Sequence, residues 1–164
     1  MLDLKTTLEN KIKGQGKVAI LGVGSELRGD DIAGLLAAGR LKNWSDKINN
    51  PLVKVFFGGT APENLTSEIK KFQPKHLVII DAADTGREAG AVTVIEPGDI
   101  GGASFGTHGL PLKIMVEYLN EYISGEIIII GIQPKTIAFG APPSKEVGQA
   151  AGNIADIIKE TIYS

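Results

Sequence analysis

Short runs of apolar residues alternate along this chain with segments in which apolar residues recur every three to four positions. Residues 18–21, 53–57, 77–80 and 127–130 form runs of strand length, and three of these carry apolar residues on both faces. Strands covered by helices on each side show that pattern. The alternation therefore predicts an α/β fold, in which a mostly parallel twisted sheet lies between two layers of helices.

A fifth apolar run, residues 92–95, follows the third after a short glycine-rich turn over residues 85–90. That connection is too short to hold a crossover helix, so the fifth strand is predicted to be antiparallel. The chain shows no repeat, low-complexity tract or linker, and its length is sufficient for a sizeable core. We therefore expect one three-layer domain over residues 1–164, with a five-stranded sheet.

The helix predicted after Asp31 has one apolar side. Ile32, Leu35, Leu36 and Gly39 fall on one side of that helix, and an apolar stripe of this kind ordinarily packs against the sheet. The helix predicted from Pro111 is expected to bury Leu112, Met115, Val116 and Leu119 by the same reasoning.

Composition excludes several classes of function. The chain has no cysteine, which rules out a thiol nucleophile, thiolate-bound zinc and an iron–sulfur cluster. A formal charge of −2 gives no basic excess for binding nucleic acid. The longest strongly apolar run, residues 127–132, is far shorter than the roughly 20 residues of a membrane helix, so no membrane insertion is expected. We expect a cytoplasmic protein.

Ligands of open α/β sheets bind beyond the carboxyl ends of the strands, and the first loop there is residues 22–31. Its glycine spacing differs from that of a dinucleotide-binding loop, and Asp30 and Asp31 would repel a pyrophosphate at the helix N-terminus. Nucleotide-dependent transfer is therefore a distant hypothesis. The simplest structural interpretation of the two aspartates is that they cap the following helix and favour its positive end.

Two further polar residues follow predicted strands or precede predicted helices. Asp81 comes directly after a buried strand, where a carboxylate needs a charge, a donor or a metal to offset its desolvation, although it could also cap a turn. His108 ends a glycine-rich segment and suits a ligand or an acid–base group, although it could be an ordinary loop residue. His76, before a strand, is interpreted as a surface or packing residue.

Two aspartates and one histidine can form a metal site with nitrogen and oxygen ligands, which suits divalent nickel, zinc, cobalt or iron. A pair of carboxylates could instead activate water directly, one of them being protonated. The residues alone are compatible with both hypotheses, a metal site and direct activation of water by carboxylates.

Five motifs in order and in register resemble the hydrogenase maturation endopeptidases, which process the large subunit of [NiFe] hydrogenases. The similarity is greatest to the branch that acts on hydrogenases of the formate-hydrogenlyase type. The motifs are GVGSELRGDD at residues 22–31, GGTAPEN at 58–64, VIIDAAD at 78–84, THGLPL at 107–112 and GIQP at 131–134.

The resemblance implies an endopeptidase that removes the C-terminal extension of a nickel-loaded large-subunit precursor, the last step of large-subunit maturation. The family's metal-contacting positions correspond to Asp31, Asp81 and His108. It also implies a five-stranded sheet with one antiparallel strand. Ser25 and Ile32 depart from the residues common in relatives, asparagine and glycine, in a loop that lines the cleft and therefore bears on substrate preference.

Asp31 and Asp81 are accordingly the predicted catalytic residues, and Asp31, Asp81 and His108 the predicted metal ligands. Water could be activated by one of the aspartates or by coordination to nickel. Because three ligands at an open edge bind metal weakly, we expect a largely metal-free enzyme, a monomer, to which the substrate presents its own nickel. The alternative is a nickel-sensing maturation chaperone of the same fold that does not cut.

Overall fold

The computed structural model describes residues 3–12, 16–102 and 109–163. His108 lies outside these residues, so its predicted role stays a prediction. The strands are β1 (Val18–Val23), β2 (Val53–Gly59), β3 (His76–Ala82), β4 (Val92–Ile95) and β5 (Ile127–Ile132). The α-helices are α1 (Leu4–Ile12), α2 (Ala33–Ile48), α3 (Thr66–Phe72), α4 (Gly109–Leu119) and α5 (Lys145–Tyr163). Short 3₁₀ helices are η1 (Gly29–Ile32), η2 (Pro62–Leu65) and η3 (Pro97–Gly102).

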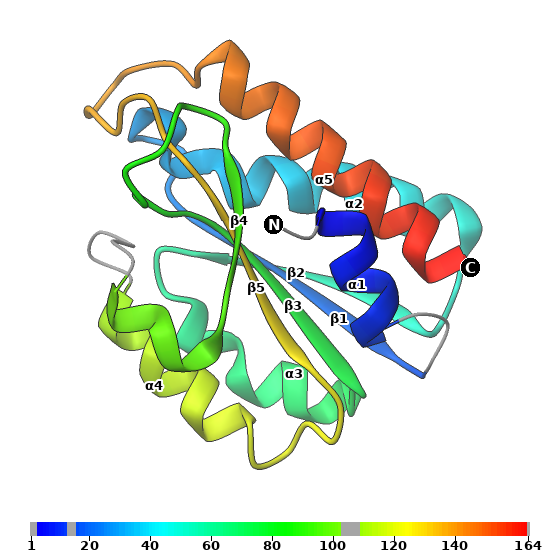
Figure 1. The fold of residues 1–164 in the computed structure, drawn as a ribbon. Helices are drawn as coiled ribbons and strands as arrows, with labels where there is room; N and C mark the ends of the chain where they lie inside the picture. Colours follow the sequence, from blue (N-terminus) through cyan, green and yellow to red (C-terminus); the bar gives the residue numbers. More distant parts are fainter. Residues whose placement is uncertain (1–2, 13–15, 103–108, 164) are drawn as a thin grey trace.

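The five strands form one sheet in the order β2-β1-β3-β5-β4 (Figure 1). The pairs β1–β2, β1–β3 and β3–β5 are parallel, whereas β4 runs antiparallel to β5. The predicted fold class and the single antiparallel strand are therefore confirmed. β4 pairs with β5 and not with β3, the strand that precedes it in the chain.

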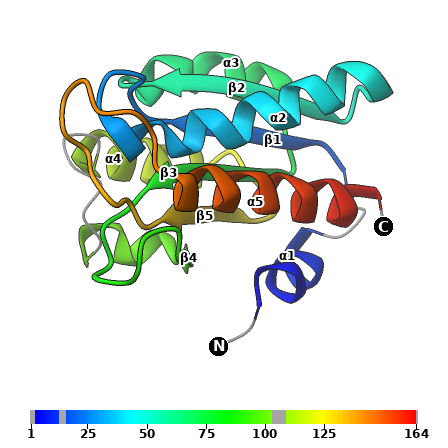
Figure 2. The same ribbon diagram turned by 90° about the horizontal axis from the view of Figure 1, so that it is seen from above.

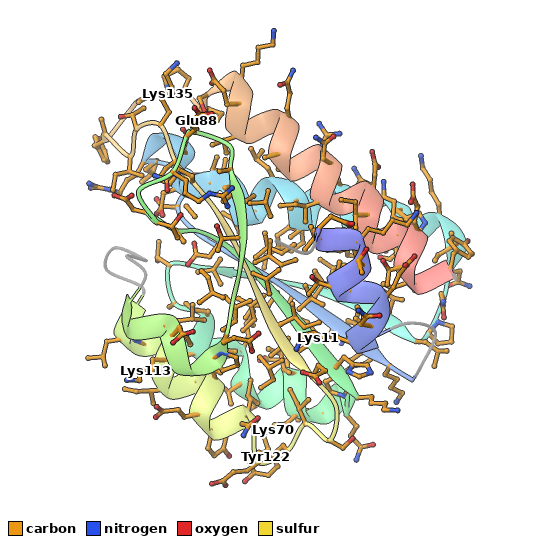
Figure 3. The ribbon with its side chains drawn as sticks, in the orientation of Figure 1. Lys11, Lys70, Glu88, Lys113, Tyr122 and Lys135 are labelled. Carbon is orange, nitrogen blue, oxygen red and sulfur yellow. The ribbon has the colours of Figure 1, made fainter. Side chains whose placement is uncertain are left out.

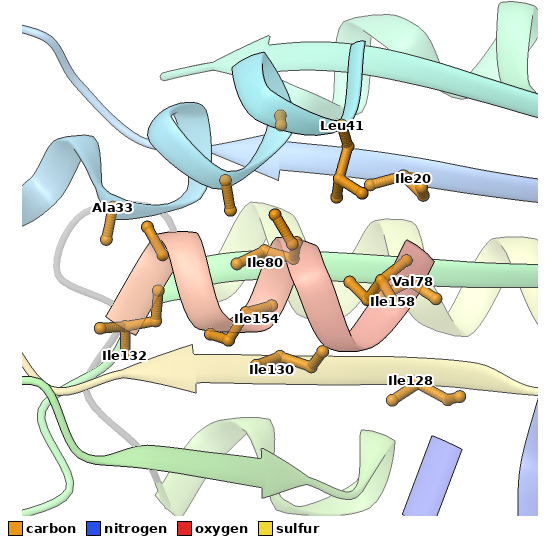
Figure 4. Packing of buried hydrophobic residues seen from close by; sticks show 14 of the residues in the cluster. Ile20, Ala33, Leu41, Val78, Ile80, Ile128, Ile130, Ile132, Ile154 and Ile158 are labelled. Atoms are coloured by element: carbon orange, nitrogen blue, oxygen red, sulfur yellow. The ribbon is translucent and has the colours of Figure 1, made fainter. Parts of the chain in front are cut away.

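Helices cover both faces of the sheet, as Figures 1 and 2 show. One core joins α1, α2 and α5 to the sheet face that carries Ile20, Val78 and Ile130, and Figure 4 shows its interlocking side chains. The second core joins α3 and α4 to the face that carries Leu21, Ile79 and other alternate residues. The continuous apolar runs arise because the central strands are buried on both faces.

The packing of α2 differs from the predicted inward face. Its buried residues are mostly small, and include Gly34, Ala37 and Ala38, whereas Leu35 and Leu36 are only half-buried. A Cβ at Gly34 would overlap the carbonyl oxygens of Ile80 and Val23, so the helix backbone lies directly on the sheet. Only small side chains permit such a close approach, so the larger side chains lie on the sides of the helix and not against the sheet.

The inward face predicted for α4 is confirmed, since Leu112, Met115, Val116 and Leu119 are all buried. Within the described parts of the chain, none of the helices has the length and hydropathy needed to span a bilayer.

Candidate functional site

The connections leaving β1 and β3 pass to opposite faces of the sheet. β1 leads through α2 to β2 at one side, whereas β3 leads through β4 and α4 to β5 at the other. α2 belongs to one core and α4 to the other. Adjacent strands with diverging connections form a topological switch point, where ligands of open α/β sheets bind. Asp31 follows β1 and Asp81 lies at the end of β3, so both predicted aspartates border this switch point.

Asp81 is a fully buried carboxylate, with 0% of its surface exposed. It pairs in register with Gly131 of β5, and its alternation with Leu77 and Ile79 places it on the sheet face covered by α4. A Cβ at Gly131 would crowd the side chains of Ala83 and Ile95, which explains the glycine opposite the aspartate. A carboxylate buried at a strand terminus has a fixed position, as a ligand or a catalytic group requires.

Asp31 lies in η1, which packs against β3. Its backbone carbonyl accepts a hydrogen bond from the Ser25 N–H at 3.2 Å, and the Gly24 N–H donates to the Gly59 carbonyl at 2.9 Å. Gly24 has a φ of +145°, and a Cβ there would overlap the Asp31 carbonyl oxygen. The glycine therefore lets the loop fold tightly beneath Asp31, whose side chain is half-buried.

Asp30 has a role that the sequence reasoning did not find. It is fully buried, and no side-chain hydrogen bond caps η1 or α2, so the predicted capping role is wrong. Its carboxylate accepts hydrogen bonds from the Ser144 N–H at 2.6 Å, the Ser144 hydroxyl at 2.8 Å and the Lys135 N–H at 2.8 Å. Asp30 thus ties the first loop to the connection between β5 and α5.

Gln133 organises the connection between β3 and β4 in a similar way. Its Oε1 accepts hydrogen bonds from the backbone and hydroxyl of Thr85, and its Nε2 donates to Asp84 Oδ1 at 3.0 Å. This hydrogen bond, with a second from the Gly86 N–H, lowers the pKa of Asp84 below its usual value. In the sequence, Gln133 is marked by its place directly after an apolar strand and by the GIQP motif at residues 131–134.

A groove of about 580 Å³ adjoins Asp31 at the ends of β1 and β2. Its apolar lining includes Ile32, Leu35 and Phe57, the last with 47% of its surface exposed. Ser25 and Ile32, the positions that depart from the common residues of relatives, both line it. The larger side chains of α2 that do not face the sheet therefore form one wall of a groove beside the candidate site.

Among the described residues, no group of three or more imidazole and carboxylate side chains is placed to hold a metal ion. The predicted three-ligand set therefore depends on position 108. α4 begins at Gly109, the next residue, and it covers the face that carries Asp81. Carboxylates at the carboxyl ends of the parallel strands fit a divalent metal, since oxygen ligands with one imidazole suit nickel, zinc, cobalt or iron.

His76 lies at the opposite end of β3 from Asp81, which agrees with its interpretation as a packing residue. It is 4% exposed, and its Nδ1 accepts a hydrogen bond from the Glu126 N–H at 2.8 Å. Burial lowers its pKa below the ordinary value of 6.5. The side chain is therefore a neutral structural element far along the strand from the aspartates.

Comparisons with known proteins point to one family. A family model described as hydrogenase maturation protease matches residues 39–161. The chain is 37% identical over 163 residues to a protein of Methanocaldococcus jannaschii predicted to be a hydrogenase maturation protease, covering 97% of this chain and 96% of that protein. It is 36% identical over 150 residues to the hydrogenase 3 maturation protease of Escherichia coli K12, covering 88% and 85%.

The fold is also similar to that of a solved structure. The crystal structure of the [NiFe] hydrogenase maturation protease HycI from Thermococcus kodakarensis aligns with a TM-score of 0.85 and 33% identity, over 96% of this chain and 99% of that one. The family model begins after Asp31, but both protein comparisons extend over most of the chain. Because the family model matches most of the chain and a relative is 37% identical over nearly all of it, this chain belongs to the hydrogenase maturation protease family.

Proposed function

We propose that this protein is an endopeptidase that removes the C-terminal extension of a nickel-loaded [NiFe] hydrogenase large-subunit precursor. The observation that carries the proposal is the placement of two aspartates, Asp31 and Asp81, at the switch point of a hydrogenase maturation protease fold. Asp81 is fully buried, and Asp31 is half-buried and directly precedes Ile32, which lines an apolar groove.

The difference in exposure divides the roles of the two carboxylates. Asp31 is half-buried and directly precedes Ile32 of the groove lining, so in this proposal it takes the proton from the attacking water. The water oxygen attacks the scissile carbonyl carbon, and the carbon–nitrogen bond then breaks as Asp31 returns the proton to the leaving amine. Asp81, held within the sheet, keeps a fixed position and orients the substrate's metal centre.

Nickel belongs to the substrate in this proposal. Asp31, Asp81 and His108 are the residues that would contact the ion, and their oxygen and nitrogen donors suit it. When present, the ion supplies a Lewis acid near the scissile bond. The chain's own contribution is to place the carboxylates where the precursor brings its metal and its tail together.

The groove beside Asp31 receives the polypeptide that flanks the scissile bond. Leu35 and Phe57 provide apolar surface, and the backbone of Gly58 and Gly59 leaves room for an extended chain. The volume of about 580 Å³ is within the range of sites that hold small ligands or a few residues of peptide.

Substitution of each aspartate by asparagine tests the proposal, because the shape is kept while the charge is lost. Asp31→Asn and Asp81→Asn should each reduce cleavage of a nickel-loaded precursor at least about 100-fold, measured by mass spectrometry as loss of the tail. Asp84→Asn is the matched control, since asparagine Oδ1 can still accept the hydrogen bonds from Gln133 and Gly86. It should cleave at the normal rate.

Near-normal cleavage by either variant, with an unchanged melting temperature, would remove that residue from the catalytic site. Specific binding of the nickel-loaded precursor by the unmodified protein without any loss of the tail would favour the chaperone interpretation and overturn the proposed activity.

A further inference from the structure

The outer surface of α4 carries a row of exposed large apolar side chains. Leu110, Ile114, Tyr118 and Tyr122 are spaced by four residues, and their exposed fractions are 70%, 58%, 42% and 52%. The first three lie on α4 and the fourth lies in the turn that follows it. Residues four apart are neighbours along a helix surface, so these side chains form one continuous row, the α4 stripe.

Packing among the described residues does not account for the α4 stripe. The inward side of α4 is complete, since Leu112, Met115, Val116 and Leu119 are each at most 2% exposed. Single exposed apolar residues are ordinary, but a contiguous row of them is typical of an interaction surface. Tyrosine in particular is enriched in the energetically dominant part of protein interfaces.

Lys70 of α3 contacts the C-terminal end of the α4 stripe, which is formed by Tyr118 and Tyr122. The Lys70 ammonium donates a hydrogen bond to the Tyr118 hydroxyl at 2.8 Å and lies 3.9 Å from the centre of the Tyr122 ring. The two rings are 5.1 Å apart, and Figure 3 shows Lys70 and Tyr122 together at one end of the molecule. Two exposed aromatic rings are thus fixed before any partner arrives, which lowers the entropy lost on binding.

A basic pocket of about 500 Å³ adjoins this end of the stripe. Lys17, Lys70 and Lys75 line it together with Tyr122 and Ser124, and the described residues that line it include no carboxylate. Three lysines around one concavity in a chain of net charge −2 form a local positive field. The complementary group on a partner is a carboxylate.

The α4 stripe begins beside the candidate catalytic edge and ends at the opposite edge of the sheet. α4 starts at Gly109 and covers the face that carries Asp81, whereas Lys17 and Lys75 immediately precede β1 and β3. An 11-residue helix spans about 16 Å. A protein whose tail reached the aspartates would therefore have its body within reach of the stripe.

We propose that the α4 stripe and the lysine pocket form a docking surface for the folded body of the hydrogenase precursor, outside the cleavage site. The proposal rests on the proposed function. The partner surface is an apolar patch flanked by a carboxylate. The patch would contact the α4 stripe, and the carboxylate would bind in the lysine pocket. Docking there selects a folded precursor over an isolated tail peptide, because an isolated tail has no such surface.

Two substitutions at exposed positions test the apolar contact. Ile114→Ser and Tyr118→Ala should raise the KM for the nickel-loaded precursor about tenfold while kcat stays within twofold. Leu52→Ser is the matched control, because Leu52 is 46% exposed but lies before β2, outside the stripe. It should leave both constants unchanged. Equal melting temperatures for the three variants establish that the domain remains folded.

Direct binding separates docking from chemistry. The inactive Asp31→Asn protein, which keeps Asp81, should bind the nickel-loaded precursor, and adding Ile114→Ser should weaken that binding about tenfold. Lys70→Gln should reduce the dependence of affinity on salt concentration, since it removes one charge from the pocket.

The outcomes are distinguishable from failure of the proposed function. If the unmodified protein does not cleave the precursor, the proposed function fails. If it cleaves, and Ile114→Ser and Tyr118→Ala keep the normal KM and affinity, only the docking proposal is overturned. A dimer in solution that Ile114→Ser dissociates would also overturn it, because a second copy would then occupy the stripe.

Discussion

Two adjacent carboxylates, Asp30 and Asp31, differ in their surroundings although they share one short 3₁₀ helix. Asp30 is fully buried and accepts hydrogen bonds from Ser144 and from the backbone that follows β5. Asp31 is half-buried beside the groove. One carboxylate therefore holds two loops together, whereas its neighbour lies closer to the surface, beside the groove.

This difference predicts that substitution by asparagine reduces stability at Asp30 and activity at Asp31. In Asp30→Asn, an NH₂ group replaces one carboxylate oxygen and faces the donors of Ser144 and Lys135, to which it cannot hydrogen-bond. The free energy of unfolding should therefore fall by about 3 kcal/mol. Asp31→Asn should lower the free energy of unfolding less than Asp30→Asn does, because Asp31 is only half-buried, and it should reduce cleavage at least about 100-fold. Denaturant unfolding of both variants checks this prediction. Equal loss of stability in the two variants would contradict the division of roles.

At the scale of elements, the contact between α2 and the sheet decides where Asp31 lies. Gly34 rests on the carbonyl oxygens at the ends of β1 and β3, three residues after Asp31. The close approach turns Leu35 away from the sheet and into the groove wall. Helix packing thus sets both the depth of the aspartate and the lining of the groove.

Two glycines of α2 give a matched test of this contact. Gly34→Ala should lower the free energy of unfolding by at least about 2 kcal/mol, because its Cβ would overlap backbone that has no freedom to move. Gly39→Ala, in the same helix with open space around it, should raise stability by up to about 1 kcal/mol. Thermal unfolding of the pair provides the measurement, and a stable Gly34→Ala protein would show that α2 tolerates displacement.

At the scale of the whole molecule, the candidate catalytic site and the lysine pocket lie at opposite ends of the sheet. The edge at the carboxyl ends of the parallel strands carries Asp31 and Asp81, whereas Lys17 and Lys75 lie at the other edge. The proposed substrate would span both, with its metal and tail at the two aspartates and its body along α4. In this proposal, the nickel ion is the signal that the precursor is ready to be processed.

The nickel proposal predicts weak binding of the free ion. Three protein ligands at an open edge leave the coordination incomplete, whereas structural metal sites ordinarily have four. Nickel titration of the enzyme alone, followed by calorimetry, should give weak binding that disappears in Asp81→Asn. A nickel-free precursor should keep its tail under conditions in which the nickel-loaded precursor is cut. Tight stoichiometric binding by the enzyme alone, or efficient cleavage of the nickel-free precursor, would refute the idea.

Several features of the fold follow from local patterns and were predicted correctly. The runs around Ile79 and Ile129 are apolar at every position because both faces are covered, and the short connection before Val92 excludes a crossover helix. The inward face of α4 follows from its helical periodicity. Asp31 and Asp81 were placed at one edge because the carboxyl ends of parallel strands meet there.

What the sequence by itself determined about this protein is therefore the set of elements, the class of fold and the edge that holds the aspartates, since each depends on periodicity or on chain connection. Only the tertiary structure decided which face of α2 meets the sheet, that Asp30 binds the loop before α5, and that Lys70 arranges two tyrosines of the α4 stripe. These depend on contacts between residues that are 48 or more positions apart or on how closely two backbones approach. Local periodicity does not predict these contacts, because many different packing partners are compatible with the same pattern of apolar and polar residues.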